Sequence, residues 1–216
     1  MSQRPYGTCF FEQYAQVELA TLLGGEFKSL VNRDRPDLQS PDTRAVGVEV
    51  TRAMEESKQA EEELLTDIAG LTAAPRSEET EQILEYGYAY GLQEGRHVGV
   101  KELSYWSMAL PLKRILKSKI TKVGNGFYGR FEQMGLFVFS WENLGEPEAV
   151  KAMNYTLNLQ KDLEIRYNRL FLADVDDLFV CNLDEGLKPS SRLARYTVTQ
   201  DHRKAFYLEA VRRVQP

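Results

Sequence analysis

An alternation of apolar and polar side chains marks residues 35–51. Val46, Val48 and Val50 alternate with small or polar residues, which is the period-2 pattern of a strand that is buried on one face. The preceding segment SPDTR, at 40–44, contains the proline and aspartate that favour a tight reversal of the chain. The pattern therefore predicts a β-hairpin with one apolar face and one acidic face.

The turn sets the register of this hairpin. A reversal centred near Thr43 pairs Leu38 with Val48 on the core side and places Asp37 directly across from Glu49. Two neighbouring carboxylates repel each other unless water screens them or a cation lies between them, and hard oxygen donors of this kind suit Mg²⁺ or Mn²⁺. A solvated hairpin face whose two acids never meet is the equally simple alternative.

Apolar periodicity and turn residues predict the other elements of the chain. The predicted helices are 10–23, 54–68, 78–90, 111–123, 146–161 and 201–213. The predicted strands are 134–141, 169–183 and 196–199, the second of which forms two strands if residues 174–177 make a turn. This order of elements predicts an α/β fold with a mixed central β-sheet flanked by helices.

Length and composition are those of a single folded domain spanning residues 1–216, with a helical insertion at about 52–122. Hydrophobic residues make up 43% of the chain, which is enough for a sizeable core. The chain has no apolar run of the roughly 20 residues that a membrane span needs, and its first residues lack the apolar core of a signal peptide. We therefore expect a cytoplasmic protein with no membrane partner.

Charge and the reactive residue types narrow the possible functions. The net charge of -5 disfavours a protein that coats DNA over a wide surface, although it is compatible with a nuclease. Cys9 and Cys181 are too few for a disulfide framework or a zinc site. The two histidines, His97 and His202, form no sequence pattern with a serine or cysteine that would indicate nucleophilic catalysis.

The hairpin also carries a family resemblance. Pro36-Asp37, followed by Glu49-Val50-Thr51 on a valine-rich strand, resembles the PD-(D/E)xK nuclease superfamily, and in particular the subset whose second motif reads G-x-E-V-T. The resemblance implies a restriction-endonuclease-like core, built as helix, three strands, helix and strand. It also implies an Mg²⁺ or Mn²⁺ site whose ligands are Asp37, Glu49 and a glutamate from the opening helix. We assign that third position to Glu18, with Glu12 and Glu26 as rivals.

The first two core strands follow from the hairpin, but the third is ambiguous. Either it lies near residues 97–103, or the first strand of the set lies before Arg35.

Thr51 stands where the family usually has a lysine that orients or activates the attacking water. Threonine can only form a hydrogen bond to that water, so a lysine from another element would have to supply the charge. The basic segment at 111–123 offers Lys119, on the apolar edge of its predicted helix, and Lys122, one turn along. This helix either contacts phosphates or is an amphipathic surface helix whose bases balance the acidic segment before it.

Two further features near this helix have alternative interpretations. Arg33 and Arg35 either contact phosphate or neutralise the acidic residues around them. The aromatic residues Phe127, Tyr128 and Phe131 either stack on bases or pack in the core.

Three functions stay open at this point. The first is a divalent-metal-dependent phosphodiesterase or endonuclease acting on nucleic acid, with DNA as the expected partner and Asp37, Glu49, Thr51, Lys119 and Lys122 as catalytic residues. The second is a catalytically inactive nuclease-like fold that serves as a nucleic-acid-binding or protein-interaction module. The third is an unrelated α/β protein with a structural role. The oligomeric state does not follow from the sequence.

Overall fold

A computed structural model of the chain describes residues 7–53, 92–93, 96–97, 110–140, 144–184 and 191–214. Its helices are α1 (Gly7–Leu22), the short 3-10 helix η1 (Gly25–Ser29), α4 (Leu110–Gly124), α5 (Glu146–Gln160) and α6 (Gln200–Val214). Its strands are β1 (Val31–Asn32), β2 (Leu38–Gln39), β3 (Val46–Ala53), β4 (Leu92–Gln93), β5 (Arg96–His97), β6 (Gln133–Ser140), β7 (Arg169–Ala173), β8 (Asp177–Asn182) and β9 (Leu193–Thr197). The helices predicted at 54–68 and 78–90 lie outside the described residues.

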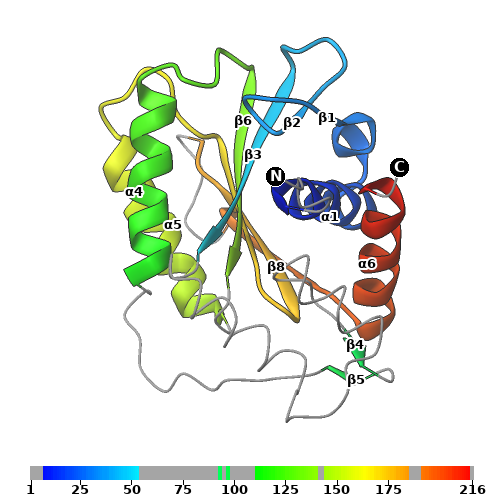
Figure 1. Ribbon diagram of the computed structural model, residues 1–216. Coiled ribbons are helices and arrows are strands. Elements are labelled where there is room, and N and C mark those ends of the chain that lie inside the picture. The colour runs from blue at the N-terminus through cyan, green and yellow to red at the C-terminus, as the bar shows by residue number, and fades with distance from the viewer. Residues whose placement is uncertain are drawn as a thin grey trace.

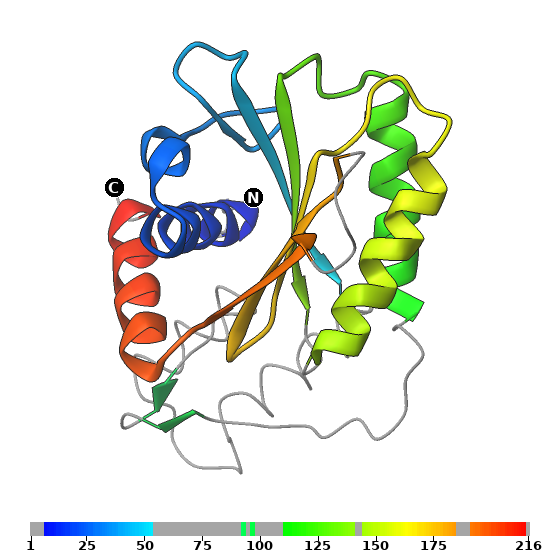
Figure 2. The same ribbon diagram turned by 180° about the vertical axis from the view of Figure 1, so that it is seen from behind.

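Seven strands form one mixed sheet in the order β1-β2-β3-β6-β7-β8-β9. The three central strands β3, β6 and β7 are parallel, and the pairs on either side of them are antiparallel. Helices α1 and α6 cover one face of the sheet and α4 and α5 cover the other (Figure 1, Figure 2). The α/β fold with a mixed sheet flanked by helices is thus confirmed. None of the described helices is both long and apolar enough to cross a membrane.

Two buried clusters, one on each face of the sheet, form the core. Val46, Val48 and Val50 of β3 pack into the cluster that contains α1 and α6, whereas Ala53 packs into the cluster that contains α4 and α5. Because successive side chains of a strand point to opposite faces, the positions between the valines face α4. Strand β6 is buried on both faces, which explains its uninterrupted apolar sequence.

The hairpin has the predicted register, since Leu38 of β2 pairs with Val48 of β3. Strand β1 lies before Arg35 and pairs with β2 in antiparallel fashion, so the first strand of the set is the one that precedes Arg35. Of the other proposed location, residues 97–103, the structure describes only His97, which belongs to the two-residue strand β5 and pairs with β4 in a separate sheet.

Residues 110–122, which we grouped with the insertion, belong to the core. They form most of α4, which packs on α5 and on β3 and lies in the connection between the parallel strands β3 and β6. Residues 174–177 turn the chain between β7 and β8, where the Asp174 carboxylate accepts hydrogen bonds from the backbone N–H groups of Asp176 and Asp177. The predicted division of 169–183 into two strands is therefore correct.

Candidate functional site

The hairpin brings Asp37 to Glu49. Asp37 comes one position before strand β2, which begins at Leu38. Its carboxylate oxygen Oδ2 accepts a hydrogen bond of 2.7 Å from the backbone N–H of Val50 in β3. Asp37 is therefore fixed beside β3, next to the residue that follows Glu49.

A glycine in β3 lets the segment before Asp37 approach this closely. A Cβ atom on Gly47 would lie 2.9 Å from Cγ of Pro36 and 2.9 Å from Cγ of Phe131. Pro36 is buried, and both rings pack over the strand at this point. Steric crowding thus explains why the G-x-E motif has glycine at position 47. Any side chain here would push Pro36, and Asp37 after it, away from Glu49.

Lys119 of helix α4 forms an ion pair with Glu49 of strand β3. Its Nζ atom lies 2.6 Å from Glu49 Oε1, and the exposed fractions of the two side chains are 14% and 9%. The buried face of α4 is formed by Leu112, Leu116, Ile120 and Val123. Lys119 lies at the edge of that face, as its spacing predicted, so its stem runs along the sheet and its ammonium reaches the strand.

Lys122, the second lysine singled out in the sequence, lies elsewhere. Its side chain is exposed, and its Nζ atom lies 5.4 Å from the centroid of the Phe127 ring. Of these two lysines, Lys119 is the one that contacts Glu49. Thr51 follows Glu49 on the same face of β3 and is half-buried.

Burial and neighbouring charge change the protonation of Asp37. Desolvation is the main cause that raises its pKa to about 7, and the Glu49 carboxylate raises it further. The hydrogen bond from Val50 and the positive charge of Lys119 oppose this shift. The two acids therefore interact, and near neutral pH both the protonated and the ionised form of Asp37 are populated.

The acid from α1 that acts on this pair is Glu12. Its carboxylate accepts a hydrogen bond of 2.7 Å from Asn32 Nδ2. Burial raises the pKa of Glu12, and the charges of Glu49 and Asp34 raise it further. Glu12 in turn raises the pKa of Asp37. We named Glu12 only as a rival, but it is the glutamate of α1 whose charge reaches both hairpin acids.

Glu18, our choice for the third ligand, has different neighbours. It is 1% exposed, and burial raises its pKa well above the usual range, with the charge of Asp174 as the second cause. Its Oε2 atom has no hydrogen-bond partner. Glu26, the other rival, forms an ion pair of 2.8 Å with Arg169. Neither glutamate is among the charges that shift the pKa of Asp37.

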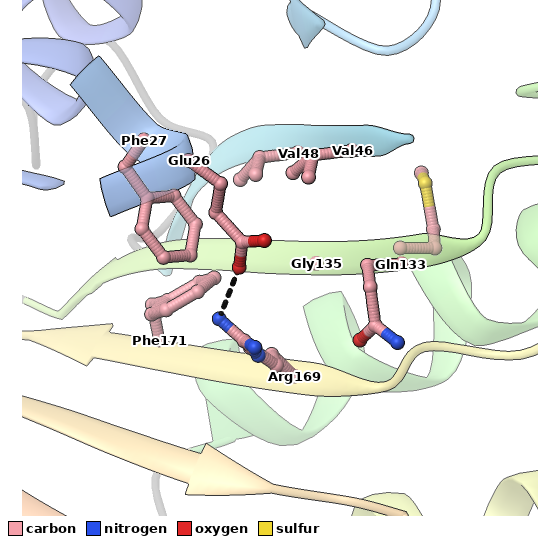
Figure 3. Close-up of a pocket in the computed structure, with 9 residues that line it drawn as sticks. Glu26, Phe27, Val46, Val48, Gln133, Gly135, Arg169 and Phe171 are labelled. Carbon is pink, nitrogen blue, oxygen red and sulfur yellow. Dashed lines mark hydrogen bonds and ion pairs between the residues drawn. The ribbon is translucent and has the colours of Figure 1, made fainter. Parts of the chain in front are cut away.

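Glu26 and Arg169 lie beside a small pocket on the α1 face of the sheet (Figure 3). The pocket lies between η1 and strands β3, β6 and β7, and its lining includes Val46 and Val48, whose side chains point away from the face of Glu49. Of the residues considered for the metal site, only Glu26, a rival for the third ligand, lines this pocket.

Two tyrosines lie beside Glu49 and Lys119: Tyr128, which we expected either to stack on bases or to pack in the core and which is buried, and Tyr167, which the sequence did not single out. The hydroxyl of Tyr128 is buried without a hydrogen-bond partner of good geometry. Burial raises the pKa of Tyr128 well above its usual range, and the Glu49 carboxylate raises it further. The hydroxyl of Tyr167 donates a hydrogen bond of 3.4 Å to the backbone oxygen of Lys119. The aromatic cluster after α4 hinted at Tyr128, but only the fold shows which of its rings lies next to Glu49.

The donors at this site fit a small divalent ion. In the part of the chain that the structure describes, no three or more His, Cys, Asp or Glu side chains gather closely enough to enclose an ion. Mg²⁺ does not need such an enclosure, because it keeps several waters and is commonly held by one or two carboxylates together with substrate phosphate. Asp37 and Glu49 are a pair of this kind, and Glu12 adds a third negative charge at longer range.

Comparison of the chain with protein-family models, with curated proteins and with solved structures finds no match.

Proposed function

We propose that this protein is a divalent-metal-dependent phosphodiesterase, an endonuclease that cleaves DNA. The observation that carries the proposal is the contact of 2.6 Å between Lys119 Nζ and Glu49 Oε1, next to a second carboxylate, Asp37, whose pKa is raised to about 7. Two carboxylates can hold a divalent ion and an ammonium group can stabilise charge on a phosphate, so these side chains suit metal-assisted phosphodiester hydrolysis.

The topology supports the same proposal. Apart from the short helix η1 and the two-residue strands β4 and β5, the described order α1, β1, β2, β3, α4, β6 matches the helix, three strands, helix and strand that the resemblance to PD-(D/E)xK nucleases implies. Asp37 comes one residue before the second strand of this set, and Glu49 lies on the third.

Each residue has a chemical role in this proposal. Asp37 and Glu49 would hold Mg²⁺ or Mn²⁺, with the charge of Glu12 behind them. When bound, such an ion polarises the scissile phosphate, lowers the pKa of a bound water and stabilises the leaving oxygen. Lys119 orients the attacking water and neutralises charge on the phosphate from α4, which Thr51 cannot do from β3.

A metal titration tests the site without relying on activity. We expect Mn²⁺ or Mg²⁺ to raise the melting temperature of the wild-type protein, and Asp37→Asn to remove the rise, because a ligand that binds only the folded state stabilises it by mass action. In parallel, plasmid DNA incubated with the protein and Mn²⁺ should be nicked or linearised. A melting temperature that does not respond to either ion, together with intact plasmid, would refute the proposal.

The second candidate is a nuclease-like module that binds nucleic acid without cleaving it, and Thr51 in the usual position of the lysine favours it. This candidate predicts binding of DNA with no cleavage under any metal. Cleavage that depends on Lys119 would exclude it, because the displaced lysine would then have replaced the missing one.

A further inference from the structure

An aromatic side chain stands exposed at the end of α4. Phe127 has 48% of its surface exposed, which is unusual for a phenylalanine in a folded domain. Its backbone is held firmly: the Phe127 N–H donates to the Lys122 carbonyl at 3.1 Å, and the Gly126 N–H donates to the Val123 carbonyl at 2.9 Å. Gly126 has a φ of 71°, so this is the Schellman arrangement that ends many helices.

Two cationic side chains lie over this ring, so a base that stacks on Phe127 takes the place of at least one of them. The Arg35 guanidinium carbon is 5.3 Å from the ring centroid, and Lys122 Nζ is 5.4 Å from it. Both side chains are exposed, and Arg35 also pairs with the exposed carboxylate of Asp34 at 3.3 Å. An exposed ring flanked by lysine and arginine matches the surfaces that bind unpaired nucleotides, where the ring stacks on a base and the cations contact the flanking phosphates.

The ring lies directly beside the candidate site. Phe127 packs edge-on against Tyr128 with ring centroids 5.2 Å apart, and Tyr128 is the neighbour of Glu49. Lys122 is one helical turn after Lys119, and Arg35 comes two residues before Asp37. The loop before β2, helix α4 and the turn after α4 thus each contribute one residue to the site and one to this surface.

From this arrangement we infer that Phe127, with Arg35 and Lys122, is a stacking platform for an unpaired DNA base, and that the site takes a single strand or a locally unpaired segment of duplex. The inference rests on the proposed function for its position next to a scissile phosphate. It adds the substrate class, because a base inside an intact duplex has no free face for Phe127.

A nucleic acid fits this surface better than a protein partner does. The large hydrophobic residues that stand exposed in the described part of the chain are Val31, Phe127 and Leu208, so Phe127 is a single ring and not part of a wide apolar patch. The exposed face of α4 next to it carries Lys113, Lys117 and Lys122, and the helix contains no acidic residue. A lone ring beside several cations offers stacking and phosphate contacts, and little apolar area.

Binding measured in EDTA tests the platform separately from cleavage. The probes are a fluorescently labelled single-stranded DNA oligonucleotide and the duplex of the same sequence, followed by fluorescence anisotropy. We expect wild type to prefer the single strand and Phe127→Ala to weaken single-strand binding by about tenfold, because the variant loses the stacking of one base on an aromatic side chain. Phe127→Trp should keep the affinity, and its indole fluorescence should be quenched by the bound base.

Leu208→Ala, which removes an equally exposed apolar side chain from α6, is the matched control and should bind like wild type. Unchanged single-strand affinity in Phe127→Ala, or a wild-type preference for the duplex, would overturn the platform. Binding that depends on Phe127 in a protein that never cleaves DNA would keep the platform and refute the endonuclease. Cleavage by a protein whose DNA binding does not depend on Phe127 would keep the endonuclease and refute the platform.

Discussion

Lys119 Nζ lies 2.6 Å from Glu49 Oε1 although 70 positions separate the two residues in the chain. Glu49 stands in the middle of β3, and Lys119 is held over it by α4, which packs on that strand. The ammonium group therefore reaches the acidic hairpin from a helix, while the strand itself carries the uncharged Thr51 two residues after Glu49. In the proposed endonuclease, Lys119 would supply the positive charge that Thr51 lacks.

Replacing Lys119 tests this directly. We expect Lys119→Ala to lower the rate of metal-dependent plasmid cleavage by about 100-fold or more, the usual range for loss of a group that assists proton transfer or charge neutralisation. Lys204→Ala, which removes an exposed lysine from α6 on the other face of the sheet, is the control and should cleave at the wild-type rate. Equal rates for the two variants would remove Lys119 from the mechanism.

The protonation of Asp37 gives the protein a predictable pH dependence. The pKa of Asp37 is raised from 3.8 to about 7. Between these values the folded state keeps a proton that the unfolded state has lost, so the free energy of unfolding falls as pH rises through this window. We expect urea unfolding to show this fall in wild type and a smaller one in Asp37→Asn. An identical pH profile in the two proteins would contradict the raised pKa.

Metal binding should depend on the same proton. Because an ion competes with the proton for Asp37, the rise in melting temperature caused by Mn²⁺ should grow as pH increases through about 7. Calorimetric titration in buffers of different ionisation enthalpy should detect proton release below that pH. A rise in melting temperature that is equal on both sides of pH 7 would show that Asp37 is not a ligand.

Local patterns were sufficient to predict the hairpin and the orientation of α4. The alternating valines of β3 and the turn around Thr43 determine the register, because a shift by one residue would expose the whole apolar face. The buried leucines of α4 likewise define one face of the helix, so Lys119 at its edge could be predicted to point toward the sheet. In both cases the interactions that determine the structure come from neighbouring residues.

The choice between Glu12 and Glu18 could not be made in this way. Both belong to α1, and helical periodicity shows which residues face the sheet but not which end of the helix lies over which strand. Glu18 lies on the same face of α1 as Tyr14 and is buried in the core near Asp174. Glu12 lies near Asn32 and the hairpin. The position of Tyr128 beside Glu49 also depends on tertiary packing, since it follows from the turn that ends α4.

The two glutamates of α1 can be separated by experiment. We expect Glu12→Gln to reduce the rise in melting temperature caused by Mn²⁺, because it removes a negative charge that acts on Asp37 and Glu49. Glu18→Gln should leave that rise unchanged. A loss of the Mn²⁺ effect in Glu18→Gln, with no loss in Glu12→Gln, would restore Glu18 as the third acid.

Glu18→Gln should instead change the pH dependence of stability. Burial raises the pKa of Glu18 well above 4.5, so wild type loses stability as pH rises above that value, while the amide has no proton to lose. Urea unfolding at acidic and alkaline pH should therefore show that the free energy of unfolding of the variant increases relative to that of wild type as pH increases. No relative gain would mean that the Glu18 carboxyl is already ionised in the folded protein.

The steric role of Gly47 leads to a prediction about both stability and activity. A Cβ atom at this position would meet Pro36 and Phe131 at 2.9 Å, so Gly47→Ala must push apart two packed rings. We expect a loss of about 1–3 kcal/mol in the free energy of unfolding, the usual cost of overpacking. Because Asp37 follows Pro36, we also expect a smaller rise in melting temperature with Mn²⁺.

A compensating substitution distinguishes this clash from a general loss of stability. Phe131→Leu removes the aromatic ring from one side of Gly47, so adding it to Gly47→Ala should recover part of the lost free energy of unfolding, although Phe131→Leu alone is destabilising. Urea unfolding of the four proteins in this cycle measures the coupling. If the two substitutions add without coupling, or if Gly47→Ala is as stable as wild type, then Pro36 and Phe131 do not close over β3, and the glycine of the motif needs another explanation.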